Sequence, residues 1–344
     1  MKAVILAAGK STRTYPLTVD MPKPLLKVAN KTLITHNLEQ LTELVNEVII
    51  VVGYRKGMIQ SHLGTRFGKV PITYVEQTQQ LGTGHALLQT ESLLKNERFM
   101  VMMGDDLYFR SDMRRCINYE HSVLAKRVEN YSDFGVFTKQ GNHVLDLIEK
   151  PQTFVSDLAN AAFYVFTNKV FACLKSLKKS PRGEYEITDA ITLLAKTEDI
   201  FCVEAKVWLP IGYPWNLLEA DQILRDDSLI GKGTVVRGIV TNSTVGENCV
   251  IEGFVKNSLI GDRVTIRGDS VVEDSIIADD VDFTGTMKSK MKAEVMINGR
   301  RHVIDNFGSV LGSGVKLRDV LLHPGTFVWP NIQKENVELR GMVQ

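Results

Sequence analysis

The first two hundred residues alternate between short apolar runs and segments with helical spacing. The apolar runs are continuous rather than alternating, which predicts strands that are buried on both faces. They cover residues 3–8, 47–53, 72–75 and 99–103. Between them, apolar residues recur at helical spacing in residues 33–41, 58–63 and 83–94. This alternation predicts an α/β fold with a doubly wound, mostly parallel sheet, whose ligands bind at the carboxyl ends of the strands.

The pattern changes near residue 228, where branched apolar residues begin to recur every six positions. The clearest runs are Ile239, Val245 and Ile251; Phe254, Ile260, Ile266 and Val272; Val271, Ile277 and Phe283; and Val315, Leu321 and Phe327. Neither a helix nor an ordinary strand has this period, whereas the short flat sides of a stacked parallel β-helix do. A β-sandwich with coincident spacing is the alternative. Residues 284–303 break the phase, which predicts an excursion loop or hairpin.

The two patterns divide the 344 residues into two predicted domains. The first covers residues 1–227 and the second covers residues 228–344. The length is ample for two domains, the first with a large core of its own.

The first apolar run opens into a loop that carries positive charge. Gly9 and the alanines before it let backbone N–H groups approach a polyanion, and Arg13 and Lys23 add positive charge. The loop therefore predicts a phosphate group as its ligand; an ordinary turn with solvated charges is the alternative. Two commoner phosphate motifs are excluded, because a P-loop needs glycine where Val4 stands and a dinucleotide fingerprint needs glycine where Ser11 stands.

Residues 6–13 read LAAGKSTR, and residues 22–25 read PKPL. These stretches resemble the signature of sugar-1-phosphate nucleotidylyltransferases, LAAGxGTR followed by PKPL, with Ser11 in place of the second glycine. The resemblance implies a Rossmann-like nucleotidyltransferase domain, and the period-six repeat resembles the left-handed β-helix of hexapeptide-repeat proteins. The resemblance to the nucleotidylyltransferase signature also implies a catalytic role for Arg13 and Lys23 and nucleotide binding by Leu6, Ala8 and Gly9.

Residues 76–86 form a second informative stretch, EQTQQLGTGHA. An amide that both donates and accepts hydrogen bonds, beside a glycine-rich backbone, suits a flat pyrimidine. In the resembled family the glutamine four residues before LGTG reads the base, which implies nucleotide binding by Gln77, Gly82 and Thr83. This form resembles uridylyl- and thymidylyltransferases more than guanylyltransferases. A polar loop that caps the helix beginning near Thr83 is the alternative, and one turn can serve both purposes.

Two carboxylates, Asp105 and Asp106, follow the apolar run at 99–103. This is a usual place for a Mg²⁺ ligand, since Mg²⁺ takes few protein oxygens and completes its shell with water and phosphate. The family pattern assigns the ligand role to Asp105. The family's second metal ligand is the aspartate of a WxDxG motif, where this chain has Pro210. Either Mg²⁺ is held by Asp105, substrate phosphates and water, with Asn216 as a candidate helper, or the site is weakened and the chain is a regulatory subunit.

Three further motifs follow at spacings that resemble the sugar-phosphate pocket of the family. They are DFGV at 133–136, IEKP at 148–151 and NAA at 160–162. The resemblance implies that Gly135, Glu149 and Asn160 hold sugar hydroxyls and that Lys150 holds the sugar phosphate. Residues 183–189, GEYEITD, match another family segment and predict the start of a helix beside the sugar.

Composition narrows the class of partner. A net charge of +1 without a basic run argues against nucleic acid and against a membrane surface. The cysteines lie far apart, at Cys116, Cys173, Cys202 and Cys249, and lack metal-ligand spacing, which suits a reducing compartment. No signal peptide or membrane span is recognisable in the sequence, so we expect a cytoplasmic location.

The β-helix is expected to serve assembly rather than a second reaction. In some relatives it carries an acetyltransferase that needs a histidine base. Here the histidines of the repeat region are His302 and His323, and the corresponding repeat near residues 312–315 has none. We therefore expect no acetyltransferase activity, and we expect a homo-oligomer with a trimer as the first candidate.

The resemblance as a whole implies an enzyme that makes a nucleotide sugar from a nucleoside triphosphate and a sugar-1-phosphate with Mg²⁺. The first candidate pair is UTP with N-acetylglucosamine-1-phosphate, as in UDP-N-acetylglucosamine pyrophosphorylases. A glucose-1-phosphate thymidylyltransferase using dTTP is the alternative within the class. A catalytically silent subunit that senses nucleotide sugars is the alternative outside it, and only Pro210 favours that interpretation.

Overall fold

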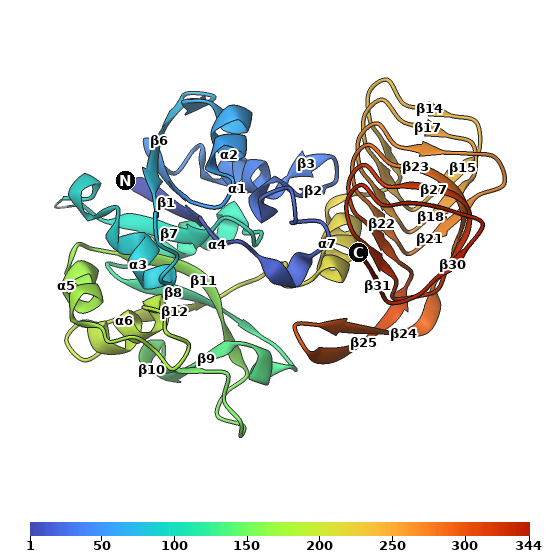
Figure 1. Cartoon of the computed structure of the whole chain (residues 1–344). Helices are drawn as coiled ribbons and strands as arrows, with labels where there is room; N and C mark the ends of the chain where they lie inside the picture. The colour runs from blue at the N-terminus through green and yellow to red at the C-terminus, as the bar shows by residue number, and fades with distance from the viewer. Residues whose placement is uncertain (96) are drawn as a thin grey trace. The chain divides into compact units, whose positions relative to one another are not determined.

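The computed structural model of the chain describes residues 1–95 and 97–344 (Figure 1). Internal contacts divide it into two compact units. The first unit consists of Met1–Gly9 and Ile34–Pro210, and the second consists of Lys10–Leu33 and Ile211–Gln344. The body of the cationic loop thus groups with the C-terminal part of the chain. None of the helices in the described part of the chain is long and apolar enough to cross a membrane.

One sheet runs through the first unit, in the order β5-β6-β4-β1-β7-β11-β8-β12-β10-β9. Its strands are β1 (Lys2–Ala7), β4 (Glu47–Val52), β5 (Arg66–Phe67), β6 (Val70–Glu76), β7 (Phe99–Met103), β8 (Ser122–Arg127), β9 (Gly135–Gln140), β10 (His143–Glu149), β11 (Leu158–Phe166) and β12 (Phe201–Glu204). The expected strands at 3–8, 47–53, 72–75 and 99–103 correspond to β1, β4, β6 and β7. These four strands are parallel, so their carboxyl ends meet at one edge of the sheet.

The expectation of a mostly parallel sheet is wrong for the second half. Strand β11 runs antiparallel to both β7 and β8, and β9 pairs antiparallel with β10. The β9–β10 connection explains part of this difference. It is a tight turn around Gly141, whose φ of +59° suits glycine, and two strands joined so closely must run antiparallel.

The helices that cover this sheet are α1 (Leu33–Leu41), α2 (Lys56–Leu63), α3 (Thr83–Leu88), α4 (Arg110–Cys116), α5 (Lys169–Ser176) and α6 (Ile187–Leu194). The helix expected over 83–94 ends at Leu88, and the 3₁₀ turn η3 (Glu91–Leu93) follows it. Thr90 is the physical reason. Its buried hydroxyl donates to the Leu87 carbonyl at 2.7 Å, which competes with continued helical bonding.

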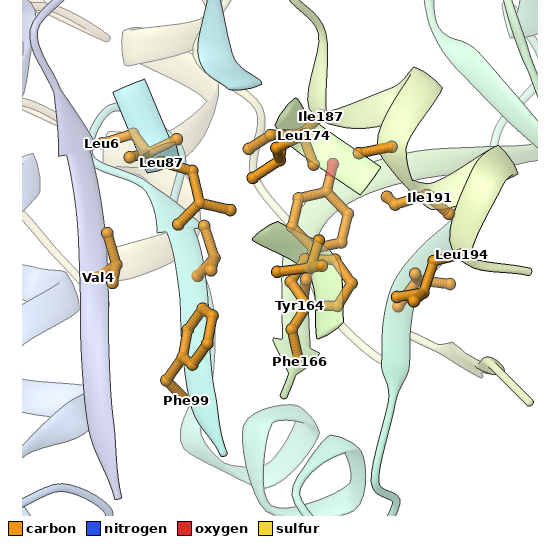
Figure 2. Packing of buried hydrophobic residues seen from close by; sticks show 14 of the residues in the cluster. Val4, Leu6, Leu87, Phe99, Tyr164, Phe166, Leu174, Ile187, Ile191 and Leu194 are labelled. Atoms are coloured by element: carbon orange, nitrogen blue, oxygen red, sulfur yellow. The ribbon is translucent and has the colours of Figure 1, made fainter. Parts of the chain in front are cut away.

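A core of buried side chains joins α3, α5 and α6 to one face of the sheet (Figure 2). Val4 and Leu6 of β1 belong to this core, together with Phe99 of β7. The alternate residues Ala3 and Ile5 are equally buried but lie outside the cluster, as expected for the opposite face. Both faces of β1 are therefore covered, which explains its continuous apolar sequence.

The second unit contains a parallel β-helix, with coils that stack strand on strand (Figure 1). One side is formed by β13 (Leu229–Ile230), β16 (Thr244–Val245), β19 (Leu259–Ile260), β22 (Ile276–Ile277), β26 (Val310–Leu311), β28 (Phe327–Val328) and β31 (Met342–Val343). The other strands of the stack are β14 (Val235–Val236), β15 (Ile239–Thr241), β17 (Val250–Ile251), β18 (Phe254–Lys256), β20 (Thr265–Ile266), β21 (Val271–Glu273), β23 (Asp282–Met287), β27 (Lys316–Leu322), β29 (Gln333–Glu335) and β30 (Glu338–Leu339). Around them lie η1 (Thr12–Thr14), η2 (Lys23–Leu25), β2 (Lys27–Val28), β3 (Lys31–Thr32) and α7 (Pro214–Leu224).

The period of six identified the stack but misplaced part of its interior. Val245, Ile260 and Ile277 are buried as expected. Ile239 and Leu321 were expected to point inward, yet they are 59% and 38% exposed. Ile239 is followed by the apolar Val240, and Leu321 lies between the buried Val320 and Leu322. Successive side chains of a strand point to opposite faces, so within such runs only alternate residues point inward.

The excursion expected over 284–303 is a β-hairpin. Its strands are β24 (Lys290–Ile297) and β25 (Arg300–Phe307), which pair antiparallel and leave the stack between β23 and β26 (Figure 1). The turn between them contains Asn298 and Gly299 at positive φ, as a two-residue hairpin turn requires.

Candidate active site

The carboxyl ends of β1 and β7 are held together by their backbones. Gly104 N–H donates to the Leu6 carbonyl at 2.9 Å. The Ala8 carbonyl accepts the Tyr54 N–H at 3.0 Å and the Gln80 side-chain amide at 2.8 Å. The start of the cationic loop therefore lies beside the residues that precede LGTG, and Asp105 follows directly after Gly104.

The glycine-rich loop after β6 is held by Gln77. This side chain is 5% exposed, and its Nε2 donates to the Gly82 carbonyl at 3.0 Å and contacts His85 Nδ1 at the same distance. The amide has two N–H groups and a carbonyl oxygen, so its engaged nitrogen leaves the oxygen as a group that can meet a base. Gln77 thus fixes the conformation of the loop as well as lying next to it.

The segment at 183–189 packs against the same loop. Gly84 N–H donates to the Tyr185 carbonyl at 2.8 Å, and Tyr185 N–H donates to the Leu81 carbonyl at 2.8 Å. The Ile187 N–H donates to Thr83 Oγ1 at 3.2 Å, so Thr83 links α3 to the first turn of α6. As expected from the sequence, the segment ends in a helix, which begins at Ile187.

The residues around Asp105 bear on whether this carboxylate can hold a divalent cation. Asp106 Oδ2 accepts the Trp208 indole N–H at 3.2 Å, and Leu107 forms an antiparallel bridge with Leu209. Pro210, at the position of the family's second metal-binding aspartate, directly follows Leu209 of this bridge. Within residues 1–95 and 97–344, no three His, Cys, Asp or Glu side chains gather as a protein metal cage would need. A single protein carboxylate is compatible with Mg²⁺, which rarely uses such cages and takes its other ligands from water and phosphate.

Gly135 and Glu149 lie side by side on β9 and β10. They are register partners, and a Cβ on Gly135 would stand 2.8 Å from Glu149 Oε2. Lys150 follows with a φ of +45°, a conformation that side chains rarely adopt, and its N–H donates to the Phe134 carbonyl at 3.0 Å. Strained backbone of this kind persists where the surrounding structure enforces it.

Arg182 connects Glu149 to the 183–189 segment. Its guanidinium lies 2.9 Å from Glu186 and 3.7 Å from Glu149. Burial raises the pKa of Glu184 and the pKa of Asp189 above their usual values, and the negative charge of Glu186 raises both further. The expected sugar-side residues of β10 and the segment before α6 therefore share one carboxylate-rich neighbourhood.

Asn160 supports an irregularity in β11. The register with β8 shifts between Asn160 and Tyr164, and Ala162 has a φ of +54°. Asn160 Oδ1 accepts the Ala162 N–H at 2.9 Å, and its Nδ2 donates to the Tyr164 hydroxyl at 2.8 Å. Burial raises the pKa of that hydroxyl, which keeps it protonated. Each Asn160 group keeps capacity for one further hydrogen bond.

Arg13 and Lys23 belong to the second unit. Arg13 lies in η1, and its guanidinium carbon lies 5.5 Å from the centre of the Tyr213 ring. Lys23 begins η2 and is 3% exposed. The position of these two side chains relative to Asp105 and Gln77 stays a prediction.

Asn216 was a candidate helper for the metal, and it caps α7 instead. Its Oδ1 accepts the backbone N–H groups of Gly212 and Tyr213 at 3.1 and 2.9 Å, and its Nδ2 donates to Glu219. The oxygen that would bind a cation thus already accepts two donors, as a helix-capping residue does.

Sequence reasoning missed three residues that shape the site. A Cβ on Gly53 would lie 2.8 Å from the Ala8 carbonyl, so this glycine permits the close approach of the loop after β4. Gln80 and Tyr185 connect the loop segments through the bonds described above. The glycine at the end of an apolar run was a visible signal. Gln80 and Tyr185 lie in stretches that the sequence singled out, but their contacts could not be read there because they join residues far apart in the chain.

A family model described as nucleotidyl transferase matches residues 2–227. The chain belongs to the nucleotidyl transferase family. A second family model, described as a GlmU-like C-terminal hexapeptide domain, matches residues 226–319 of this nucleotidyl transferase. The period-six pattern is thereby confirmed as a hexapeptide repeat.

Curated relatives of this nucleotidyl transferase include a protein named as bifunctional and a uridylyltransferase. The chain is 38% identical over 229 residues to the "Bifunctional protein GlmU" of Methanococcus vannielii, which covers 64% of this chain and 54% of that protein. It is also 38% identical over 239 residues to the "UTP--glucose-1-phosphate uridylyltransferase AglF" of Haloferax volcanii, covering 66% of this chain and 98% of that protein. The chain thus spans about half the length of the bifunctional relatives that it matches.

Solved structures match the same part of this nucleotidyl transferase. A UDP-glucose pyrophosphorylase complexed with UDP-glucose matches with a TM-score of 0.60 and 28% identity, over 65% of this chain and 97% of that one. A putative glucose-1-phosphate thymidylyltransferase from Bacillus anthracis matches with a TM-score of 0.60 and 31% identity, over 66% and 96%. The expected membership of the sugar-1-phosphate nucleotidylyltransferases is confirmed.

Proposed function

We propose that the chain transfers a nucleoside monophosphate from UTP or dTTP to a sugar-1-phosphate, giving a nucleotide sugar and pyrophosphate. One observation carries the proposal. The parallel strands β6, β1 and β7 end at one edge of the sheet, and the hydrogen bond from Gln80 to the Ala8 carbonyl holds two of the loops there together. The expected phosphate, base and metal motifs begin at these strand ends.

The proposed roles divide the residues between the nucleotide and the sugar-1-phosphate. The nucleotide contacts Leu6, Ala8, Gly9, Gln77, Gly82 and Thr83, and the sugar phosphate contacts Gly135, Glu149, Lys150 and Asn160. Lys23 lies near the α-phosphate and Arg13 on the leaving pyrophosphate. The backbone of Gly135 and the carboxylate of Glu149 orient sugar hydroxyls, and Lys150 balances the charge of the sugar phosphate.

The proposed reaction is a direct displacement. An oxygen of the sugar-1-phosphate forms a bond to the α-phosphorus, and the bond from that phosphorus to the bridging oxygen breaks. The electron pair leaves with pyrophosphate, so no side chain becomes covalently attached. Catalysis then consists of positioning and charge stabilisation, with Arg13 and Lys23 as the donors. Asp105 would hold Mg²⁺, which when bound would supply charge neutralisation on the phosphate oxygens.

The first candidate substrates are UTP and N-acetylglucosamine-1-phosphate. The name of the UTP--glucose-1-phosphate uridylyltransferase from Haloferax volcanii favours UTP. The thymidylyltransferase match favours dTTP with glucose-1-phosphate as the second candidate. Pro210 favours the third, a silent subunit that senses nucleotide sugars.

The test is pyrophosphate release with Mg²⁺, measured for UTP, dTTP, GTP and ATP in combination with several sugar-1-phosphates. We expect release with a pyrimidine triphosphate and one preferred sugar-1-phosphate. Preference for a purine triphosphate would refute the base assignment. Silence across all pairs, while nucleotide sugars still bind in calorimetry, would support the sensing subunit.

The division of labour between the domains is part of this proposal. We assign nucleotidyl transfer to residues 1–227, and to residues 228–344 a left-handed β-helix that drives homo-oligomerisation in the cytoplasm, with a trimer as the first candidate. Sedimentation as a monomer would contradict the assembly. His323 pairs with Glu338 at 3.1 Å and His302 packs against aromatic rings, and we assign neither a role as an acetyltransferase base. Thiol release from acetyl-CoA with an amino-sugar phosphate would overturn that assignment.

A further inference from the structure

The hairpin formed by β24 and β25 has no role in the proposed reaction, yet it is built to pack on one face. Ala293, Val295 and Ile297 of β24 are buried, whereas Glu294 and Met296 between them are exposed. A hairpin that only bridged two coils would not need such an apolar face. The contacts of its second strand show what it packs against.

His302 of β25 packs into a group of aromatic rings. Its ring centre lies 4.6 Å from that of Tyr213 and 5.4 Å from that of Trp215. Tyr213 and Trp215 are stacked with centres 4.6 Å apart and planes inclined by 6°, and Phe307 closes the group at 6.1 Å from Trp215. The hairpin therefore packs against Tyr213 and Trp215 at the start of α7.

Tyr213 in turn supports Arg13. Its backbone is fixed because its N–H donates to Asn216 Oδ1 at 2.9 Å. The guanidinium carbon of Arg13 lies 5.5 Å from the ring centre, within the range of a cation–π interaction. Arg13 is itself exposed, so this ring restricts a side chain that would otherwise sample many rotamers.

The tip of the hairpin meets the same loop a second time. Asn298 Nδ2 donates to Thr12 Oγ1 at 3.4 Å, one residue before Arg13. Two separate contacts thus lead from the hairpin to the turn that carries the arginine.

We propose that the β24–β25 hairpin positions Arg13 for pyrophosphate, with Tyr213, His302 and Asn298 as positioning residues. The identity of the ligand, pyrophosphate, rests on the proposed function. The contacts among the hairpin, Tyr213 and Arg13 do not depend on it. Prepositioning lowers the entropy lost when the guanidinium meets its ligand, so its loss weakens pyrophosphate binding more than it slows later steps.

The kinetic test is pyrophosphorolysis by the full chain, with the nucleotide sugar saturating and pyrophosphate varied. Tyr213→Leu removes the ring, and we expect KM for pyrophosphate to rise about two- to fivefold, with the KM for nucleotide sugar unchanged. Tyr213→Phe keeps the ring and should behave as the unmodified chain. His302→Ala and Asn298→Ala should raise the same KM to a smaller extent. Val303→Ala, a change on the adjacent and 56% exposed side chain of β25, is the matched control.

A variant pair separates positioning from general damage. In an Arg13→Ala background, Tyr213→Leu should have no further effect on KM for pyrophosphate, because the group that it positions is gone. An equal effect in both backgrounds would overturn the proposal, and so would a His302→Ala variant that matches Val303→Ala.

A second measurement does not depend on activity. The Nε–H resonance of Arg13 should shift in Tyr213→Leu and in His302→Ala, because the aromatic ring beside it is removed or displaced, and should stay in place in Val303→Ala. A silent chain whose resonance shifts in this way would refute the proposed function and leave the positioning intact. An unshifted resonance would overturn the positioning, whatever the activity.

Discussion

Gly82→Ala tests whether the conformation of the glycine-rich loop controls nucleotide binding. Gly82 has a φ of 101° and a ψ of 176°, a region that only glycine adopts readily. A Cβ there would lie 2.6 Å from the Tyr185 carbonyl oxygen and 2.8 Å from the Cβ of Glu184. The oxygen belongs to the backbone and cannot rotate away, so the loop has to move.

The cost follows from the contacts that such a movement would weaken. The backbone conformation costs an alanine about 1–3 kcal/mol. The two hydrogen bonds between Tyr185 and the loop, both 2.8 Å, contribute about 1 kcal/mol each. The sum is centred on about 4 kcal/mol, or nearly a thousandfold in an equilibrium constant. Gln77 donates to the Gly82 carbonyl, so the proposed base reader shifts with the loop.

The assay compares KM for the nucleoside triphosphate with KM for the sugar-1-phosphate, alongside urea unfolding. We expect KM for the nucleotide to rise at least about tenfold, the rest of the nearly thousandfold cost being expressed as lost stability. The matched control is Gly141→Ala, where φ is +59° but no atom lies within 4 Å of the added Cβ. It should cost about 1 kcal/mol in stability and leave both KM values unchanged. A Gly82→Ala variant with the same KM values as the control would refute the reasoning.

Three further predictions concern charge and burial. Asp105→Asn should lower turnover about a hundredfold or more and raise the Mg²⁺ concentration needed, as measured by pyrophosphate release; an unchanged Mg²⁺ response would remove Asp105 from the metal site. Asp221→Asn leaves a buried arginine partner unpaired, 2.8 Å away, and should cost about 3 kcal/mol in urea unfolding, against less than about 1 kcal/mol for Glu252→Gln in an exposed pair. Burial raises the pKa of Cys116 to about 12 and that of Cys202 to about 11, so at pH 8 both thiols should resist a disulfide reagent until the chain unfolds. Because thiolate is the reactive form, the labelling rate should rise only as the pH approaches those values. Rapid labelling of the folded chain at pH 8 would contradict this prediction.

The strands and the family were predictable from sequence because both depend on residues that are close in the chain. The apolar runs gave the parallel half of the sheet, and LAAGKSTR with LGTG gave the family. The antiparallel half was not predictable by the same argument. Strand β11 has a long apolar sequence like β1, and period and composition do not distinguish the direction in which a fully buried strand runs.

The β-helix contained a signal that the period of six did not use. A serine directly precedes β13, β16, β19, β22 and β26, after an Asp, Asn or Gly in each case. In the structure these serines form a buried ladder, in which Ser243, Ser258 and Ser275 each accept the backbone N–H of the next serine at 3.0–3.1 Å. Their positions mark where β13, β16, β19, β22 and β26 begin, and so set the register of the residues in those strands.

The chemical type of each site residue was predictable from sequence, but its hydrogen-bond partners were not. Gln77 was expected to read a base, and the structure adds that its amide holds the Gly82 carbonyl and His85. Asn216 was expected near a metal because of its place in the sequence, and it caps a helix. A side chain with one amide can serve either purpose, and only the positions of distant backbone groups decide between them.

The cationic loop is covalently an extension of β1, but its body is fastened within the second unit. Lys27 pairs with Asp262 of the β-helix at 2.5 Å, Asn30 donates to the Val245 carbonyl at 3.0 Å, and the Ala29 N–H donates to Asp221 of α7 at 2.7 Å. Together with the hairpin beneath Arg13, these contacts order a loop whose sequence alone specifies charge and small residues. A short motif can identify the phosphate chemistry because glycine and arginine are needed at those positions. The order that makes such a loop effective has to come from elsewhere, and here the β-helix, its hairpin and α7 supply it. The β-helix is therefore part of the structure that presents the proposed catalytic arginine, in addition to any role in assembly.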